Sequence, residues 1–311
     1  WTGVATLAGA LRRRVWIDMR QFQWTPNMYI VLVAPAGVAA KSTSIRQGLS
    51  MLEAVEGVHF GPQSMTWQAL IKSFTTAQTT FSAPGSDTST PMSCLTIGVG
   101  ELGTFLDPKN REFMDLLTAM WDGQKEVWRR ETVGSGRVEI YNPWLNLIAC
   151  TTPSWLRSNF PEDLIGGGLT SRIVVVYGDR KRQLIAYPSE LIEEDDWTQE
   201  EKCLVHDLRE ISNLCGQYRL TPEAIAWGDK WYRHHNNGGT PTHLASGRYD
   251  GYLARKQTHV HKLGIILAAS KRSELVVTEG DLREAEGHIS ALETDMLQVF
   301  NSIGNSPAAR Q

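Results

Sequence analysis

The chain has 311 residues, of which 41 % are hydrophobic and 21 % are charged, and its formal net charge is −3. A chain of this length buries a large core, so we expect one main domain and a smaller one. The near-balanced charge excludes a protein that binds nucleic acid through a general positive field. Any contact with nucleic acid must therefore come from local basic patches.

The cysteines and the hydropathy of the chain give further expectations about disulfides, metal ligands and membrane contact. The four cysteines show no spacing typical of zinc ligands, and Cys94 and Cys150 lie inside apolar runs, so we expect buried free thiols in a reducing cytoplasm. No apolar stretch approaches the roughly 20 residues that a bilayer span needs, so we expect no membrane contact. The chain has no signal peptide and starts with Trp1 instead of methionine, and we interpret it as a portion of a longer protein.

The first part of the chain alternates apolar runs with helical patterns. Residues 4–19 predict a helix and a short strand, joined at residues 12–14. Apolar runs predict buried strands at 29–34, 94–99, 144–150 and 173–177, as in a parallel sheet. Helical spacing predicts helices after Lys41, at 66–74 and at 110–123. The stretch 79–91, rich in Ser, Thr, Pro and Gly, predicts a surface loop, and residues 125–143 predict a basic hairpin.

After about residue 188 the patterns are helical, notably at 221–235, 252–270 and 278–300. We therefore expect a lead-in over 1–28, an α/β core over 29–188 and an all-helical domain over 189–311. Strands that alternate with helices predict a doubly wound parallel sheet. Ligands of such sheets bind at the carboxyl ends of the strands.

The stretch VLVAPAGVAAKSTSI (31–45) departs twice from the phosphate-binding pattern G-x-x-x-x-G-K-[ST], because Pro35 and Ala40 replace its two glycines. Backbone N–H groups, a helix N-terminus and a lysine hold the phosphates in such loops, so the pattern still predicts a nucleotide site. Lys41 would contact the β- and γ-phosphates, and Ser42 would bind Mg²⁺ through its hydroxyl. An ordinary strand-to-helix turn is the alternative. The candidate residues are Pro35, Ala36, Gly37, Val38, Ala39, Ala40, Lys41, Ser42 and Thr43.

Polar residues follow the next two predicted strands. Glu101 is the candidate general base that orients the attacking water, although Gly100 stands where an aspartate usually serves magnesium. A solvated turn residue or helix cap is the alternative. Thr151 or Thr152 could hydrogen-bond the γ-phosphate or the water, and a simple turn is the alternative there.

Cations supply two further candidates. Arg172 follows three glycines and is the candidate arginine finger that reaches a neighbouring subunit's nucleotide, with a salt bridge at the sheet edge as the alternative. The hairpin combines cations that bind phosphates with Trp128 and Tyr141, which could stack bases. The candidate nucleic-acid residues are Lys125, Arg129, Arg130 and Arg137.

Six segments also follow one another in a familiar order: PNMYIVLVAPAGVAAKST, TIGVGELGTFL, LLTAMWDGQKEVWRRET, NLIACTTPSWL, GGGLTSRIVVVYG and YLARKQTHVHKLGIILA. Over about residues 5–300 the chain resembles helicase-like P-loop ATPases of phage, plasmid and mobile-element replication proteins, often fused behind a primase-polymerase. The resemblance implies a RecA/AAA+-like P-loop NTPase sheet of the additional-strand type, sandwiched by helices. It implies Lys41 and Ser42 as the Walker A pair, Glu101 as the Walker B carboxylate, Thr151 or Thr152 as a sensor and Arg172 as the finger.

We therefore expect an ATP-dependent DNA helicase or translocase that hydrolyses ATP with Mg²⁺ between the subunits of a homo-oligomeric ring, a hexamer. Its expected partners are single-stranded DNA and a fused or associated primase-polymerase, in the cytoplasm of a bacterial host. One alternative is a nucleotide-binding scaffold or loader with weak hydrolysis. The other is a P-loop kinase that acts on a small molecule.

Overall fold

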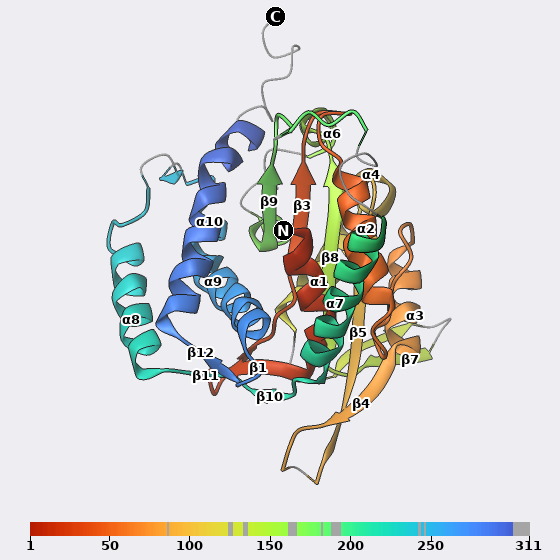
Figure 1. Ribbon diagram of the computed structural model, residues 1–311, viewed down its shortest axis with the longest axis vertical. Coiled ribbons are helices and arrows are strands. Elements are labelled where there is room, and N and C mark those ends of the chain that lie inside the picture. The colour runs from red at the N-terminus through yellow and green to blue at the C-terminus, as the bar shows by residue number, and fades with distance from the viewer. Residues whose placement is uncertain are drawn as a thin grey trace, which may run out of the picture.

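A five-stranded sheet forms the centre of the protein (Figure 1). The structure is a computed structural model that describes residues 1–85, 87–123, 127–132, 136–160, 167–181, 183–187, 194–241, 244–245 and 247–300. The strand order is β4 (Gln78–Ser82), β5 (Ser89–Val99), β8 (Pro143–Thr151), β3 (Tyr29–Val33) and β9 (Ile173–Tyr177). The last four strands are parallel, and β4 pairs antiparallel with β5. The predicted α/β fold with a mostly parallel sheet is confirmed.

The register aligns the carboxyl ends of the parallel strands. Val33 at the end of β3 lies opposite Thr151 of β8 and Tyr177 of β9, and Val99 at the end of β5 lies opposite Ala149. These ends form one edge of the sheet, which we call the loop edge. Because β8 lies between β3 and β5, the loops after these three strands are neighbours there.

The predicted surface loop over 79–91 is wrong in part. Its two ends are strands, since β4 and the start of β5 pair from Gln78↔Ser93 to Ser82↔Ser89. Threonine and phenylalanine favour extended backbone when one face of a strand is covered. Phe81 provides that contact, because it packs on the small apolar cluster of Met92, Cys94 and Trp144.

Helices cover both faces of the sheet. In Figure 1, α1 (Thr2–Leu11), α2 (Lys41–Glu53) and α7 (Glu194–Asn213) lie together in front of it. Helix α5 (Arg111–Asp122) also packs against β8, and α3 (Trp67–Thr76) packs against β5. All nine residues of β8 are buried, which explains its continuous apolar sequence.

The predicted C-terminal helical region is confirmed. Helix α10 (Glu279–Phe300) packs on β9, and α9 (Asp250–Lys271) and α8 (Pro222–Asn236) both pack on α10 (Figure 1). Val260 and Leu263 of α9 belong to the same hydrophobic core as Tyr29 of the sheet. Helix α7, in contrast, packs on α1 and α2. No helix in the described ranges is long and apolar enough to cross a membrane.

The expectation that strands are absent after residue 188 is wrong in detail. Short strands join the C-terminal helices to each other and to the lead-in, because β10 (Gly216–Gln217) pairs with β1 (Val15–Asp18), and β11 (Arg219–Leu220) pairs with β12 (Val276–Val277). Strand β1 also pairs with β2 (Gln23–Trp24) and follows the short helix η1 (Arg12–Arg14). Two-residue strands leave almost no period-2 pattern in a sequence.

Candidate functional site

The phosphate-loop candidate connects β3 to α2 at the loop edge. Gly37 has a φ of 72°, the left-handed region that favours glycine, and no other residue between 34 and 40 has a positive φ. Ala40, in place of the usual second glycine, has an ordinary φ of −80°. The two missing glycines are therefore not needed for the backbone that this loop adopts.

Lys41 closes the loop from the first turn of α2. Its Nζ donates to the carbonyl oxygen of Ala34 at 2.8 Å and reaches that of Pro35 at 3.5 Å. No side chain caps the N-terminus of α2, and Ser42 and Thr43 are exposed there. Uncapped N–H groups at a helix N-terminus, with an ammonium beside them, form an arrangement suited to an anion.

Gly98 in β5 and Gly100 just after its end lie where α2 comes close to the sheet. A Cβ at Gly98 would stand 2.0 Å from Cδ1 of Leu49, so a larger residue there would displace the Leu49 side chain. Two residues further, on the same face of β5, a Cβ at Gly100 would meet Cβ of Ser42 at 4.0 Å. The end of β5 and the candidate magnesium ligand are therefore in contact range.

Glu101 follows at the N-cap of the short helix α4 (Leu102–Phe105). Its side chain is exposed and makes no capping hydrogen bond, so the predicted cap alternative does not apply. Burial raises the pKa of the neighbouring Cys150 thiol to about 11, while Lys41 lowers that pKa and Glu101 raises it. Lys41 and Glu101 therefore both lie near the end of β8.

The two candidate threonines have different surroundings. Thr151 ends β8, its backbone oxygen accepts from the N–H of Ala34 at 3.3 Å, and its buried hydroxyl has no hydrogen-bond partner in the described structure. Thr152 is the N-cap of α6 (Pro153–Asn159), where its hydroxyl accepts from the N–H of Trp155 at 3.2 Å. The Thr151 hydroxyl is therefore unpartnered but buried, whereas the Thr152 hydroxyl caps a helix.

A hollow of about 380 Å³ opens beside the loop on the β9 side, a size within the range of small-molecule sites. Its walls come from Trp1 and Thr2, from the ends of β3 and β9, and from residues 39–41. Glu101 and Thr151 are not among the residues that line the hollow. The hollow's aromatic residues, Trp1 and Tyr177, were not expected from the sequence, because neither belongs to a motif.

The prediction that Arg172 is an arginine finger is wrong. Arg172 ends the short helix η3 (Thr170–Arg172) at the start of β9, so it lies at the edge opposite the loop. Its side chain is 5 % exposed, and its guanidinium makes two bonds with the carboxylate of Asp122, Nε–Oδ1 at 2.9 Å and Nη2–Oδ2 at 2.7 Å. A finger must be exposed to a neighbouring subunit. The alternative, a structural salt bridge, is correct.

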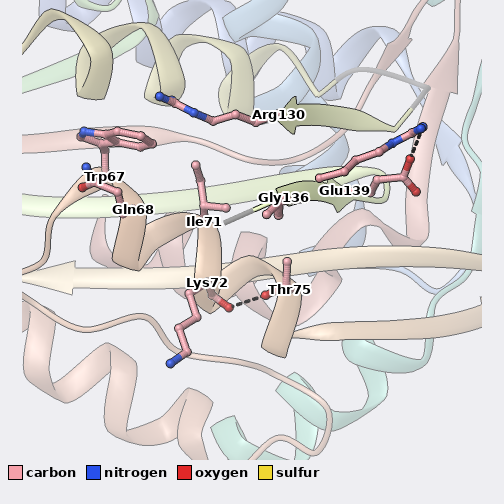
Figure 2. A pocket seen from close by; sticks show the side chains of 10 residues that line it. Trp67, Gln68, Ile71, Lys72, Thr75, Arg130, Gly136 and Glu139 are labelled. Carbon is pink, nitrogen blue, oxygen red and sulfur yellow. Dashed lines mark hydrogen bonds and ion pairs between the residues drawn. The ribbon is translucent and has the colours of Figure 1, made fainter. Parts of the chain in front are cut away.

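The basic hairpin is present as β6 (Trp128–Thr132) and β7 (Gly136–Ile140). Arg129 and Arg137 both pair with Glu139, with N–O distances of 2.9 Å and 2.6 Å. Arg130 points the other way and places its guanidinium 3.7 Å from the ring centroid of Trp67 on α3 (Figure 2). Lys125, the fourth predicted nucleic-acid residue, lies outside the described residues.

No group of three His, Cys, Asp or Glu side chains in the described part of the chain could hold a metal ion by itself. A nucleotide-borne Mg²⁺ is a different case, because phosphates supply most of its ligands and the protein adds one or two. Ser42 fits that role, and Gly100 contributes no carboxylate.

Comparison with known proteins gives no assignment: no protein-family model matches the chain, and no curated protein matches it.

Proposed function

We propose that this protein binds ATP with Mg²⁺ at the loop edge and hydrolyses it. One observation supports this most: the order β5-β8-β3-β9 brings Lys41, Glu101 and Thr151, which are far apart in the sequence, to one edge of the sheet, where Lys41 also lines a hollow of about 380 Å³. The carboxyl edge of a parallel sheet is where such folds bind ligands.

In this proposal the base and sugar lie in the hollow and the phosphates lie across the loop. The uncapped N-terminus of α2 and the Lys41 ammonium neutralise the phosphate charge, and an incoming phosphate replaces the carbonyls of Ala34 and Pro35 as partners of Nζ. Mg²⁺, held by the phosphates and Ser42, supplies further charge neutralisation. Glu101 orients the attacking water, and Thr151 donates its hydroxyl to the γ-phosphate or the water.

The finer proposal is that hydrolysis drives movement along single-stranded DNA, in a homo-oligomeric ring of the kind the resemblance implies. The exposed cations of the β6–β7 hairpin support a nucleic-acid partner. A second candidate function, a nucleotide-binding scaffold or loader with weak hydrolysis, is favoured by Gly100, because a site without a magnesium carboxylate retains binding more easily than turnover.

The test measures phosphate release by wild type and by Lys41→Ala with Mg²⁺, with and without single-stranded DNA, and records the oligomer mass alongside. We expect hydrolysis that DNA stimulates and that Lys41→Ala abolishes. Lys230→Ala, which removes an exposed lysine from the distant helix α8, is the matched control and should match wild type. Equal turnover by Lys41→Ala and wild type rules out this site, and ATP binding without turnover selects the scaffold.

A further inference from the structure

A second hollow lies on another part of the molecule, between α3 and the β6–β7 hairpin (Figure 2). Its volume is about 430 Å³. Helix α3 contributes Trp67, Ile71 and Lys72, and the hairpin contributes Arg130, Arg137 and Glu139. We call this hollow the α3–hairpin groove. It contains none of the residues of the loop edge.

The charge of the groove is positive. Three cations line it, Lys72, Arg130 and Arg137, together with the carboxylate of Glu139, and Glu112 of α5 lies 4.0 Å from the Arg130 guanidinium. Lys72 is exposed and makes no ion pair within the described ranges. Glu139 is shared, because both Arg129 and Arg137 bond to it, so one carboxylate neutralises two guanidinium groups incompletely. The whole chain has a net charge of −3, so the groove is more positive than the protein as a whole.

The groove also presents a flat stacking surface. Figure 2 shows Arg130 beside Trp67 at one end and Glu139 with its ion pair at the other. The guanidinium lies 3.7 Å from the centre of the half-buried indole, which is stacking distance. Lys72, at the rim, also borders the neighbouring hollow that contains His59 and the partly exposed Phe60. The two hollows therefore share Lys72, and each contains an aromatic ring.

We propose that the α3–hairpin groove binds single-stranded DNA, with one base stacked on the Trp67–Arg130 pair and its flanking phosphates bound by Lys72 and Arg137. This inference rests on the proposed function for the choice of single-stranded DNA as the partner. It adds where on the molecule the DNA binds. Trp67 and Lys72 lie on α3, outside the hairpin in which the sequence predicted nucleic-acid contacts. Helix α3 and the hairpin therefore each contribute part of the proposed site.

The combination of groups favours nucleic acid over an acidic peptide. Cations bind the phosphates of a nucleic acid whatever its sequence. Planar side chains stack on the flat faces of the bases, and every base has such a face. An acidic peptide would satisfy Lys72 and Arg137 but would leave the flat surface of Arg130 and Trp67 without a planar partner. The proposed contacts are to the faces of the bases and to the phosphates, so we expect binding with little sequence preference.

The test measures binding of a fluorescein-labelled oligo-dT strand of about 20 nucleotides by anisotropy, without nucleotide, over a series of salt concentrations. We expect Lys72→Glu and Arg137→Glu each to weaken binding about tenfold or more, and Lys72→Gln to reduce the slope of log affinity against log salt by about 0.7. Lys230→Glu on α8, on the opposite side of Figure 1, should change affinity less than about twofold. Circular dichroism shows whether each variant is folded.

Photo-crosslinking locates the strand independently of the charge variants. Oligo-dT with 5-iododeoxyuridine should crosslink to the peptide that contains Trp67, as mapped by mass spectrometry. Crosslinks confined to other peptides, or wild-type affinity in both Lys72→Glu and Arg137→Glu, would overturn the proposal. If the groove variants lose binding but wild type hydrolyses no ATP, the groove stands and the proposed function fails. If wild type hydrolyses ATP while the groove variants bind normally, the opposite holds.

Discussion

Gly100 faces Ser42 across the junction of β5 and α2. A Cβ on Gly100 would stand 4.0 Å from Cβ of Ser42, and no other non-neighbouring heavy atom lies within 4 Å of it. The position therefore has room for a longer side chain, and its φ lies outside the left-handed region. In P-loop enzymes a carboxylate next to the serine or threonine serves the magnesium ion, and this chain has the place for it without the carboxylate.

The first prediction is that Gly100→Asp improves magnesium-dependent activity. A carboxylate beside Ser42 would add a ligand or hydrogen-bond acceptor to the proposed Mg²⁺ site, and a charged hydrogen bond contributes about 1.5–3 kcal/mol. We expect about tenfold lower Mg²⁺ concentration at half-maximal hydrolysis. Gly100→Asn is the matched control, because it adds the same bulk without the charge. Equal magnesium dependence in the Asp and Asn variants would show that position 100 does not face the metal.

The second prediction concerns Thr151→Val. The buried Thr151 hydroxyl has no partner in the described structure, and a buried polar group without a partner costs about 1–3 kcal/mol. We therefore expect the free energy of unfolding of Thr151→Val to equal or exceed that of wild type, while turnover falls about tenfold. Urea unfolding and phosphate release measure the two effects. Thr152→Val is the contrast, since loss of a helix cap lowers stability by about 1 kcal/mol.

The sequence indicates the loop edge well because the signals there are strong. Continuous apolar runs mark β3, β8, β9 and most of β5, and parallel strands align their carboxyl ends. What it could not show is the contact of Gly98 and Gly100 with α2, because that contact depends on how closely a helix seats on a strand. The hollow beside Trp1 and Tyr177 also depends on packing between distant segments.

Arg172 shows where the same approach fails. A run of glycines before a strand is found at functional sites and at ordinary turns alike. The sequence around Arg172 also did not show that its side chain would be buried by an ion pair at the edge opposite the loop. The decisive partner, Asp122, lies 50 residues away at the end of α5. The prediction of a loop over 79–91 was wrong for a related reason. The two ends of this stretch pair with each other, and Phe81 packs on Trp144, which is distant in the sequence.

The third prediction follows from this ion pair. Asp122→Asn leaves the buried Arg172 guanidinium with a weakened partner, and breaking a fully buried pair costs about 3–5 kcal/mol. Because the Asp122 side chain is 44 % exposed, we expect a smaller loss of stability, about 1–3 kcal/mol. Turnover per folded molecule should not change. Asp115→Asn, an exposed position on the same helix, is the control in thermal unfolding. A stable variant with selectively reduced turnover would restore a catalytic role for Arg172.

The fourth prediction is that Glu139→Gln increases affinity for single-stranded DNA. Hydrogen bonds from Tyr141, Arg129 and Arg137 lower the pKa of Glu139 to about 2, so the carboxylate stays ionised at neutral pH and competes with phosphates for both arginines. Removing its charge should tighten oligo-dT binding about threefold to tenfold and steepen its salt dependence. Glu131→Gln changes the same charge on the same hairpin at a residue without an ion pair among the described residues, and its effect should be smaller. Unchanged affinity in Glu139→Gln would separate the two hairpin arginines from DNA binding.

The last prediction concerns the pH dependence of stability, to which two buried histidines of α9 contribute. Burial lowers the pKa of both His259 and His261 from 6.5 to about 4. His259 donates from Nε2 to the carbonyl oxygen of Ser171 at 3.0 Å, and its Nδ1 is buried without a hydrogen bond in the described structure, so protonation inside the fold is unfavourable. Both histidines are therefore neutral in the native protein at neutral pH.

The sign follows from the order of the two pKa values. Below about pH 6.5 the unfolded chain binds protons that the native state does not, so the free energy of unfolding falls as pH is lowered from 6.5 toward 4. Each histidine contributes a slope of up to about 1.4 kcal/mol per pH unit. Urea unfolding of His259→Gln between pH 6.5 and about 5 should give a slope lower than the wild-type slope by up to about 1.4 kcal/mol per pH unit, because one titrating group is removed and glutamine can still donate to Ser171. His206→Gln, at an exposed position on α7, should leave the slope unchanged. A wild-type slope in His259→Gln would mean that His259 is already protonated, or solvated, in the folded protein.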